Sequence, residues 1–149
     1  MSANHPVIAV TGSSGAGTST VKTAVEHILT REHLKAIIVE GDSFHRFDRY
    51  EMPEEVAKAH QSGRDLSHFG PDGNHFEKLE ALFRDYSETG RGTIRYYLHN
   101  ESEAVPYKQK PGTFTPWENI TENTDLLFYE GLHGGMVNGS VNIAKYVDL

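Results

Sequence analysis

The 149-residue sequence contains no cysteine, and this absence excludes several kinds of chemistry. Without cysteine the protein has no disulfide bond, no thiolate ligand for zinc or an iron–sulfur cluster, and no thiol nucleophile. The sequence also lacks an apolar run approaching the roughly 18 residues that a membrane-spanning helix needs. Its N-terminus, MSANHPVIAV, lacks the basic segment and apolar stretch of a signal peptide. We therefore expect a soluble, cytoplasmic protein that binds no membrane.

Basic and apolar residues are both scarce. Lysine and arginine together number 14, against 21 aspartate and glutamate residues, which gives a net charge of −7. A nucleic-acid-binding protein should carry a basic stripe, so we expect no nucleic-acid partner. Leu, Ile, Val and Phe make up 34 of the 149 residues. That share lies just above the roughly 20% below which disorder is expected, and the length fits one compact domain.

The pattern of apolar residues predicts an α/β fold with a parallel sheet. Segments 6–11, 36–40 and 125–130 are short and almost wholly apolar, as strands buried on both faces are. Apolar residues at helical spacing predict a helix over 19–31, so the first forty residues read as the crossover unit of a parallel sheet. We also expect helices over 53–62 and 76–86, a strand over 93–98, a loop over 108–119, and the start of another αβ unit over 137–149.

A glycine-rich loop between the first predicted strand and helix gives the strongest functional signal. It matches the phosphate-binding pattern G-x-x-x-x-G-K-[ST] and consists of Gly12, Ser13, Ser14, Gly15, Ala16, Gly17, Thr18, Ser19 and Thr20. The amide groups of such a loop and the N-terminus of the helix together attract a polyphosphate. Thr18 stands where the pattern has lysine, so another cation must serve the phosphates. The alternative is an ordinary Gly/Ser-rich turn from strand to helix.

The segment after the second strand carries a carboxylate and several cationic side chains. Ligands of open α/β sheets bind beyond the carboxyl ends of the strands, and Asp42 lies two residues past such an end. Asp42 could accept the proton of an attacking hydroxyl group, as the catalytic aspartate of kinases does, or it could cap the next helix. His45, Arg46 and Arg49 offer donors to an anionic substrate, and arginine is well shaped for phosphate.

Glu130 ends the third predicted strand. P-loop proteins hold Mg²⁺ with the loop hydroxyl, here that of Ser19, and an acidic residue at the end of a neighbouring strand. The alternative is a carboxylate that leaves the strand into solvent. Of the nine histidines, His99 and His133 are the two whose location could reach a cleft. We favour the core over a substrate platform for Tyr96, Tyr97, Phe114 and Trp117.

Taken together, these segments resemble phosphoribulokinase, and specifically its bacterial branch, in which threonine also replaces the P-loop lysine. The resemblance runs through nearly the whole chain and rests on GSSGAGTST, EGDSFHRFDR, SHFGPDGNHFEKLE, GTFTPW and LLFYEGLHGGMVN. It implies a P-loop kinase fold and the ATP- and Mg²⁺-dependent phosphorylation of D-ribulose 5-phosphate to D-ribulose 1,5-bisphosphate. That reaction supplies the acceptor for carbon dioxide fixation in the Calvin cycle. The resemblance also implies a homo-oligomer at full length.

The resemblance assigns roles by position. Residues 12–20 would bind ATP, with Ser19 and Glu130 directed toward Mg²⁺. Asp42 would activate the C1 hydroxyl of the sugar. His45 and Arg49 would lie in the sugar-phosphate pocket. The cysteine pair that gives plant-type members redox control has no counterpart here, so we expect no redox switch.

The length of the chain departs from the family that it resembles. Members are about twice as long, and the signature of lysine, arginine and aspartate in their second half has no match here. We therefore expect residues 1–149 to be the N-terminal part of a longer kinase domain with a sheet incomplete at its C-terminal end. Such a chain should be poorly soluble and almost inactive alone. Another small-molecule kinase, such as uridine kinase, and a non-catalytic nucleotide-binding module left by truncation are the alternative hypotheses.

Overall fold

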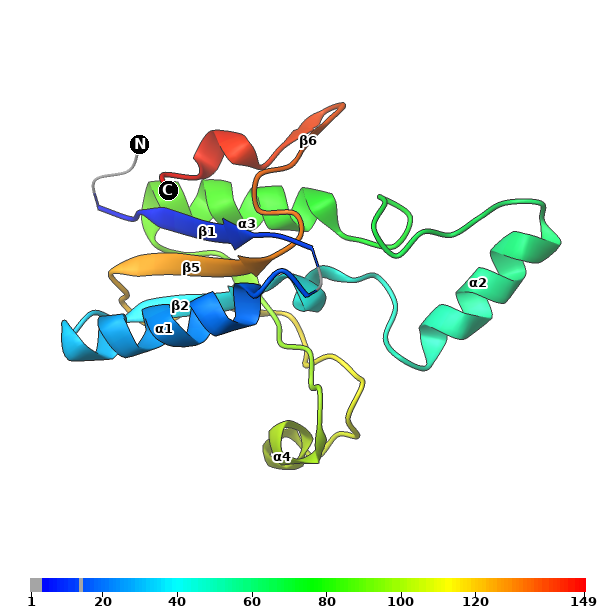
Figure 1. Ribbon diagram of the computed structural model, residues 1–149, viewed down its shortest axis with the longest axis horizontal. Coiled ribbons are helices and arrows are strands. Elements are labelled where there is room, and N and C mark those ends of the chain that lie inside the picture. The colour runs from blue at the N-terminus through cyan, green and yellow to red at the C-terminus, as the bar shows by residue number, and fades with distance from the viewer. Residues whose placement is uncertain (1–3, 14) are drawn as a thin grey trace.

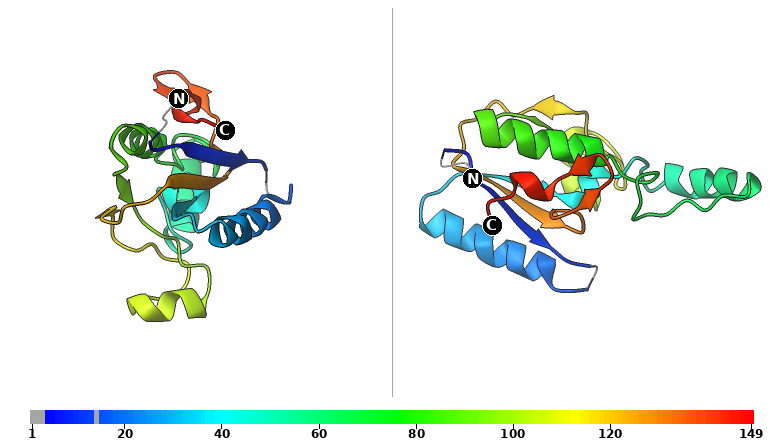
Figure 2. Two further views of the ribbon diagram at one scale, coloured as in Figure 1. Left: turned by 90° about the vertical axis from the view of Figure 1, so that its left-hand side faces the viewer. Right: turned by 90° about the horizontal axis from the view of Figure 1, so that it is seen from above.

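A three-stranded parallel sheet lies between two helices in the computed structural model, which describes residues 4–13 and 15–149 (Figure 1). The strands are β1 (Val7–Thr11), β2 (Ala36–Glu40) and β5 (Leu126–Gly131), in the spatial order β1-β5-β2. Figure 2 shows α1 (Thr18–Arg31) on one face of the sheet and α3 (Phe76–Thr89) on the other. This arrangement confirms the predicted parallel α/β sheet flanked by helices.

Alternate residues of each strand face opposite helices, which divides the core into two layers. The larger layer joins Val7, Val39, Leu127 and Tyr129 of the sheet to Leu79, Leu82, Phe83 and Tyr86 of α3. The other layer joins Ile8, Ile38, Leu126 and Phe128 to Val25 and Leu29 of α1. Strand β5 is central and buried on both faces, which explains its unbroken apolar run.

Shorter elements surround the sheet. Helix α2 (Glu51–Gln61) stands away from it at the end of two long connections (Figure 1), and α4 (Glu101–Ala104) lies beside the 3-10 turn η2 (Val105–Tyr107). The remaining pairs are antiparallel: β3 (Thr93–Ile94) with β4 (Glu118–Asn119), and β6 (Val137–Asn138) with β7 (Val141–Asn142). Among the described residues, no helix has both the length and the apolar character needed to cross a bilayer.

Three predicted elements differ from the structure, of which the loop expected over 108–119 differs least, since it ends in the two-residue strand β4. The strand expected over 93–98 ends at Ile94, after which the chain follows residues 112–115 through single backbone bonds such as that from the Leu98 amide to the Thr113 carbonyl (3.0 Å). The αβ unit expected over 137–149 is instead the β6–β7 hairpin followed by the 3-10 turn η3 (Ala144–Tyr146). Gly139, at φ 58°, provides the left-handed conformation that a tight hairpin turn requires.

The parallel arrangement brings three connecting segments to one edge of the sheet. Glu130 is the register partner of both Val10 in β1 and Glu40 in β2. The glycine-rich loop leaves β1 at this edge, the 3-10 turn η1 (Gly41–Phe44) leaves β2, and residues 132–133 leave β5. The fold therefore gathers the candidate residues of three separate sequence segments in one place.

Candidate active site

Two adjoining cavities open at this edge of the sheet. The first has a volume of about 490 Å³ and is lined by the glycine-rich loop, by the end of β2 and by the end of β5. The second, of about 540 Å³, lies toward α2 and is lined by Arg49, Met52 and Tyr97 among others. Asp42, His45 and His68 line both. We refer to these as the loop cavity and the α2 cavity, and they meet at those three side chains.

The glycine-rich loop has the backbone geometry of an anion-binding loop. Gly15 and Gly17 have φ values of 84° and 87°, in the left-handed region that favours glycine. The Gly12 amide donates to the Gly131 carbonyl at 3.1 Å, which ties the loop to β5. Of the predicted loop residues, those that line the loop cavity are Gly12, Ser13, Gly15, Gly17, Thr18 and Ser19. Ala16 and Thr20 belong to the same loop and first helical turn, whereas Ser14 lies outside the described residues.

Lys22 supplies a cation to the loop cavity that the sequence motif does not predict. It lies one helical turn beyond Thr18, and its ammonium group is 2.8 Å from Glu40 and 3.6 Å from Glu26. Burial opposes its charge, but the two carboxylates leave the pKa of Lys22 above its ordinary value. Among the lining residues that the structure describes, Lys22 is the one lysine or arginine of this cavity. Its spacing of four from Thr18 was the available sequence signal.

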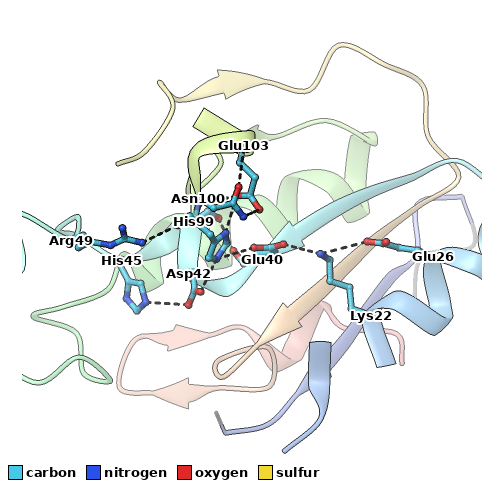
Figure 3. Close-up of polar contacts among 10 residues, drawn as sticks. Lys22, Glu26, Glu40, Asp42, His45, Arg49, His99, Asn100 and Glu103 are labelled. Atoms are coloured by element: carbon cyan, nitrogen blue, oxygen red, sulfur yellow. Dashed lines mark hydrogen bonds and ion pairs between the residues drawn. The ribbon is translucent and has the colours of Figure 1, made fainter. Parts of the chain in front are cut away.

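Asp42 lies in η1 between two histidine rings. The Nε2 atoms of His45 and His99 lie 3.4 Å and 3.3 Å from its carboxylate oxygens (Figure 3). The hydrogen bond with His45 lowers the pKa of Asp42 most; burial acts in the opposite direction, and the bond with His99 lowers the pKa further. The carboxylate is therefore ionised at neutral pH and is held at the junction of the two cavities.

A different aspartate supports the start of α2. Asp48 accepts hydrogen bonds from the amides of Tyr50 and Glu51, both at 2.9 Å. The alternative in which Asp42 caps the next helix is therefore wrong. The side chain of Asp42 is free of that structural task, since its described contacts are the two histidine rings.

His99, predicted to reach a cleft, contacts Asp42 where the two cavities meet but lines neither of them. Its Nδ1 lies 3.1 Å from Glu103, and its Nε2 lies 3.6 Å from Glu40. Burial disfavours the imidazolium, but the hydrogen bonds with Glu103 and Asp42 raise the pKa of His99 above its ordinary value. In Figure 3 the contacts run without a break from His45 through Asp42, His99 and Glu40 to Lys22, and so connect the α2 cavity with the loop cavity.

The two arginines predicted to face an anionic substrate lie in different places. Arg49 lines the α2 cavity, where its Nη2 donates to the His99 carbonyl at 3.0 Å. Gly112 packs against this side chain so closely that a Cβ there would lie 2.9 Å from it. Arg46 instead donates to the Pro71 carbonyl at 2.9 Å and contacts the His75 ring at 3.1 Å, and it lines neither cavity. Its expected role toward substrate is therefore wrong, because it binds the 71–77 segment.

The end of β5 forms the floor of the loop cavity. Glu130 lines this cavity, as Ser19 does. The Tyr129 hydroxyl lies beside Gly41 and Gly131 and accepts a hydrogen bond from the His133 amide at 3.2 Å. A Cβ at Gly41 or Gly131 would lie 2.6 Å or 2.5 Å from that hydroxyl. Glycine is therefore required at both positions next to this tyrosine.

Residues 68–69 and 133 form the rim of the loop cavity. His133 lines it, as predicted, with its Nε2 3.1 Å from the Phe69 carbonyl and its ring 4.7 Å from that of Phe76. Burial lowers the pKa of His133. Phe69 is 67% exposed although it is a large apolar side chain. His68 and Phe69 belong to the segment SHFGPDGNHFEKLE that carries the family resemblance, but no role at the site was predicted for either residue.

The aromatic residues expected in the core have mixed positions. Trp117 is partly buried against the larger core layer, as predicted. Tyr97 lines the α2 cavity, with its ring edge-to-face on that of His99 at 4.8 Å. Tyr96 is 46% exposed. The core prediction is therefore confirmed for Trp117 and wrong for Tyr96 and Tyr97.

Known proteins resemble this chain in both sequence and structure. The family described as Phosphoribulokinase / Uridine kinase matches residues 7–149. The chromosomal phosphoribulokinase of Cupriavidus necator is 55% identical over 150 residues, which is 100% of this chain and 51% of that protein. The solved phosphoribulokinase from Rhodobacter spheroides superposes with a TM-score of 0.85 at 45% identity, over 98% of this chain and 50% of that one.

A more distant structure shares the fold alone. A possible uridine kinase from Bacillus stearothermophilus has a TM-score of 0.67 at 16% identity, and the match covers 100% of this chain and 70% of that one. These structures confirm the P-loop kinase-like fold. The chain spans about half the length of the curated relatives that it matches.

Proposed function

The chain belongs to the phosphoribulokinase and uridine kinase family, and we propose that the protein containing it transfers the γ-phosphoryl group of ATP to D-ribulose 5-phosphate. The product would be D-ribulose 1,5-bisphosphate, the acceptor of carbon dioxide in the Calvin cycle. One observation carries this proposal: Asp42 lines both the loop cavity and the α2 cavity, so a carboxylate lies where a nucleotide and an acceptor would meet. Residues 1–149 would form the N-terminal part of the kinase domain.

The loop cavity is proposed to bind ATP. Its glycine conformations and the N-terminus of α1 suit the β- and γ-phosphates, because backbone amides and the helix dipole both attract an anion. Lys22 would add a positive charge that Thr18 does not supply. Its two carboxylate partners hold the ammonium group at the wall of the cavity until the phosphates compete for it.

Ser19 and Glu130 are proposed to hold Mg²⁺. Both line the loop cavity, and a hydroxyl and a carboxylate oxygen are the hard ligands that Mg²⁺ prefers. Kinase sites hold this ion with one or two carboxylates together with substrate phosphates, so a dedicated cage of protein ligands is not needed. Bound Mg²⁺ would neutralise charge that develops on the phosphates.

The α2 cavity is proposed to bind the sugar phosphate. Arg49 presents the remaining N–H groups of its guanidinium for a phosphate, and His45 lines the same volume. Asp42 would accept the proton of the C1 hydroxyl while the oxygen of that hydroxyl attacks the γ-phosphorus and ADP leaves. The low pKa of Asp42 keeps it ionised for this task, and His99 fixes its second oxygen.

A phosphorylated sugar fits this site better than an uncharged nucleoside. The α2 cavity holds Arg49 and His45 close to Asp42, and a neutral acceptor would leave the arginine without an anionic partner. The likeness to the possible uridine kinase is one of fold and does not bear on the substrate. The homo-oligomer implied by the bacterial phosphoribulokinases is likewise proposed for the full-length protein.

The test is a substrate panel on the product of the complete reading frame that contains these residues. ADP release would be measured with ribulose 5-phosphate, with uridine and without acceptor. We expect ADP release with ribulose 5-phosphate and none with uridine or without an acceptor. Preference for uridine would replace the proposed substrate, and ATP binding without turnover on any acceptor would favour a non-catalytic nucleotide-binding module.

The 149-residue chain should be assayed beside that product. Phosphoryl transfer depends on positioning and on cations around the transferred group. Among the described residues, Lys22 is the one lysine or arginine that lines the loop cavity, and it is paired with two carboxylates. We therefore expect little or no ADP release from the 149-residue chain alone, and vigorous release would contradict this expectation.

A further inference from the structure

Arg95 binds the turn that carries Asp42, although 53 positions separate the two residues in the sequence. It follows β3, and its Nε donates to the Ser43 carbonyl at 2.8 Å. Its Nη2 donates to the His45 carbonyl. The two carbonyls follow Asp42 by one and three residues, so a single guanidinium holds both parts of the segment that presents Asp42 and His45.

Two aromatic rings fix the guanidinium itself. Its central carbon lies 3.6 Å from the centre of the Phe114 ring and 4.3 Å from that of Trp117. The Trp117 ring in turn lies 5.6 Å from that of Phe44, the last residue of η1. Burial lowers the pKa of Arg95 to about 10, so the side chain is charged at neutral pH. Lysine cannot replace this side chain, because its ammonium group is not planar and does not stack on aromatic rings as a guanidinium does.

The turn is short, and contacts from outside supplement its own hydrogen bonds: besides Arg95, the His75 amide donates to the Phe44 carbonyl at 2.7 Å. η1 spans Gly41–Phe44, and a 3-10 turn has poorer hydrogen-bond geometry than an α-helix. The bond that closes it, from the His45 amide to the Asp42 carbonyl, is long at 3.4 Å. Arg95 lines neither the loop cavity nor the α2 cavity, so it acts on the site through the turn and not through contact with substrate.

We propose that Arg95 is a positioning residue for phosphoryl transfer: held against the rings of Phe114 and Trp117, it fixes the turn so that Asp42 and His45 face the two cavities. This inference rests on the proposed function. It would connect the segment around Trp117 to a site that this segment does not line. Misplacement of a reacting group by about 1 Å can cost about 100-fold in rate, and the loss of this brace allows such a displacement.

The test compares Arg95→Lys and Arg95→Ala in the product of the complete reading frame. For Arg95→Lys we expect a fall in kcat of about 100-fold, a higher KM for ribulose 5-phosphate because His45 moves, and an unchanged KM for ATP. For Arg95→Ala, added guanidinium should restore part of kcat, because the ion can enter the space beside the two rings, whereas ammonium should not. Arg95→Lys keeps the comparison decisive if Arg95→Ala does not fold.

Arg91→Lys is the matched control. Arg91 also donates to a backbone carbonyl, that of Glu122 at 2.7 Å, and to the side chain of Asn123 at 2.7 Å, and it lines neither cavity. Its replacement should leave kcat and both KM values unchanged. If Arg95 had a purely structural role, its replacement would lower the melting temperature and the active fraction of the protein. Both KM values and the response to guanidinium would then match those of the control, and this result would overturn the inference.

The wild-type protein separates the two hypotheses. If it does not phosphorylate ribulose 5-phosphate, the proposed substrate is wrong, and the Arg95 comparison is then made with whichever acceptor it does phosphorylate. If the wild type is active and Arg95→Lys matches it in kcat and in the KM for the acceptor, the inference about Arg95 is wrong while the proposed function stands.

Discussion

Replacement of Asp42 by asparagine isolates the proton-accepting role of this residue. The amide keeps the shape of the carboxylate and can still accept from one histidine ring and donate to the other, so the contacts with His45 and His99 need not collapse. General-base catalysis contributes about 10²–10⁴-fold in rate, or roughly 3–5 kcal/mol at about 1.4 kcal/mol per factor of ten. Because Asp42 is 56% exposed and phosphoryl transfer depends mainly on positioning, we expect the lower part of this range, about 10²–10³-fold.

The assay is steady-state ADP release by the product of the complete reading frame, with each substrate varied in turn. The KM for ATP should not change, because Asp42→Asn leaves the glycine-rich loop intact. Asp85→Asn is the matched control: Asp85 lies on α3, paired with Arg84 at 3.0 Å, and lines neither cavity. A loss in kcat of less than about tenfold, or an equal loss in the control, would refute the argument that Asp42 accepts the proton.

Three further predictions concern single side chains. Lys22→Met should raise the KM for ATP about tenfold in steady-state assays and leave the KM for the sugar phosphate unchanged, because one of several phosphate contacts worth about 1–2 kcal/mol is lost. Leu127→Ala should lower the free energy of unfolding by about 2–5 kcal/mol in urea titrations, since this fully buried side chain lies in the central strand. His99 has a raised pKa in the folded protein, so its pairing with Glu103 and Asp42 stabilises the fold fully below about pH 6.5 and progressively less as the pH rises through the folded value. The melting temperatures of His99→Gln and the wild type should therefore differ more at about pH 6 than at about pH 9, and a constant difference would contradict this.

The sequence correctly predicted the elements that are specified by residues close together in the chain. Three buried strands, the glycine-rich loop and its helix are specified by runs of apolar residues and by glycine spacing, and all of them are present. The hairpin formed by Val137–Asn138 and Val141–Asn142 was not predicted, because two-residue strands are too short to show a period.

The sequence did not predict contacts between distant segments. Lys22 enters the loop cavity because Glu40 attracts it from another element, and no local motif encodes that pair. The brace from Arg95 to the Ser43 and His45 carbonyls joins positions about fifty residues apart. Asp42 was correctly placed at the carboxyl end of its strand, and its partner His45 lies three residues away, but its contact with His99 joins residues 57 positions apart and follows from tertiary structure.

The close approach of Tyr129 to Gly41 and Gly131 has a consequence for how this family can diverge. A methyl group at position 41 or 131 collides with the hydroxyl at position 129, so neither glycine can mutate first without damage. Positions 41 and 129 should therefore covary among relatives, with a smaller side chain at 129 preceding any side chain at 41, whereas a Cβ at 131 would also lie 2.9 Å from the Cα of Gly41. Such coupling should slow change in the floor of the cavity relative to position 18 of the glycine-rich loop, where threonine already stands in place of the usual lysine.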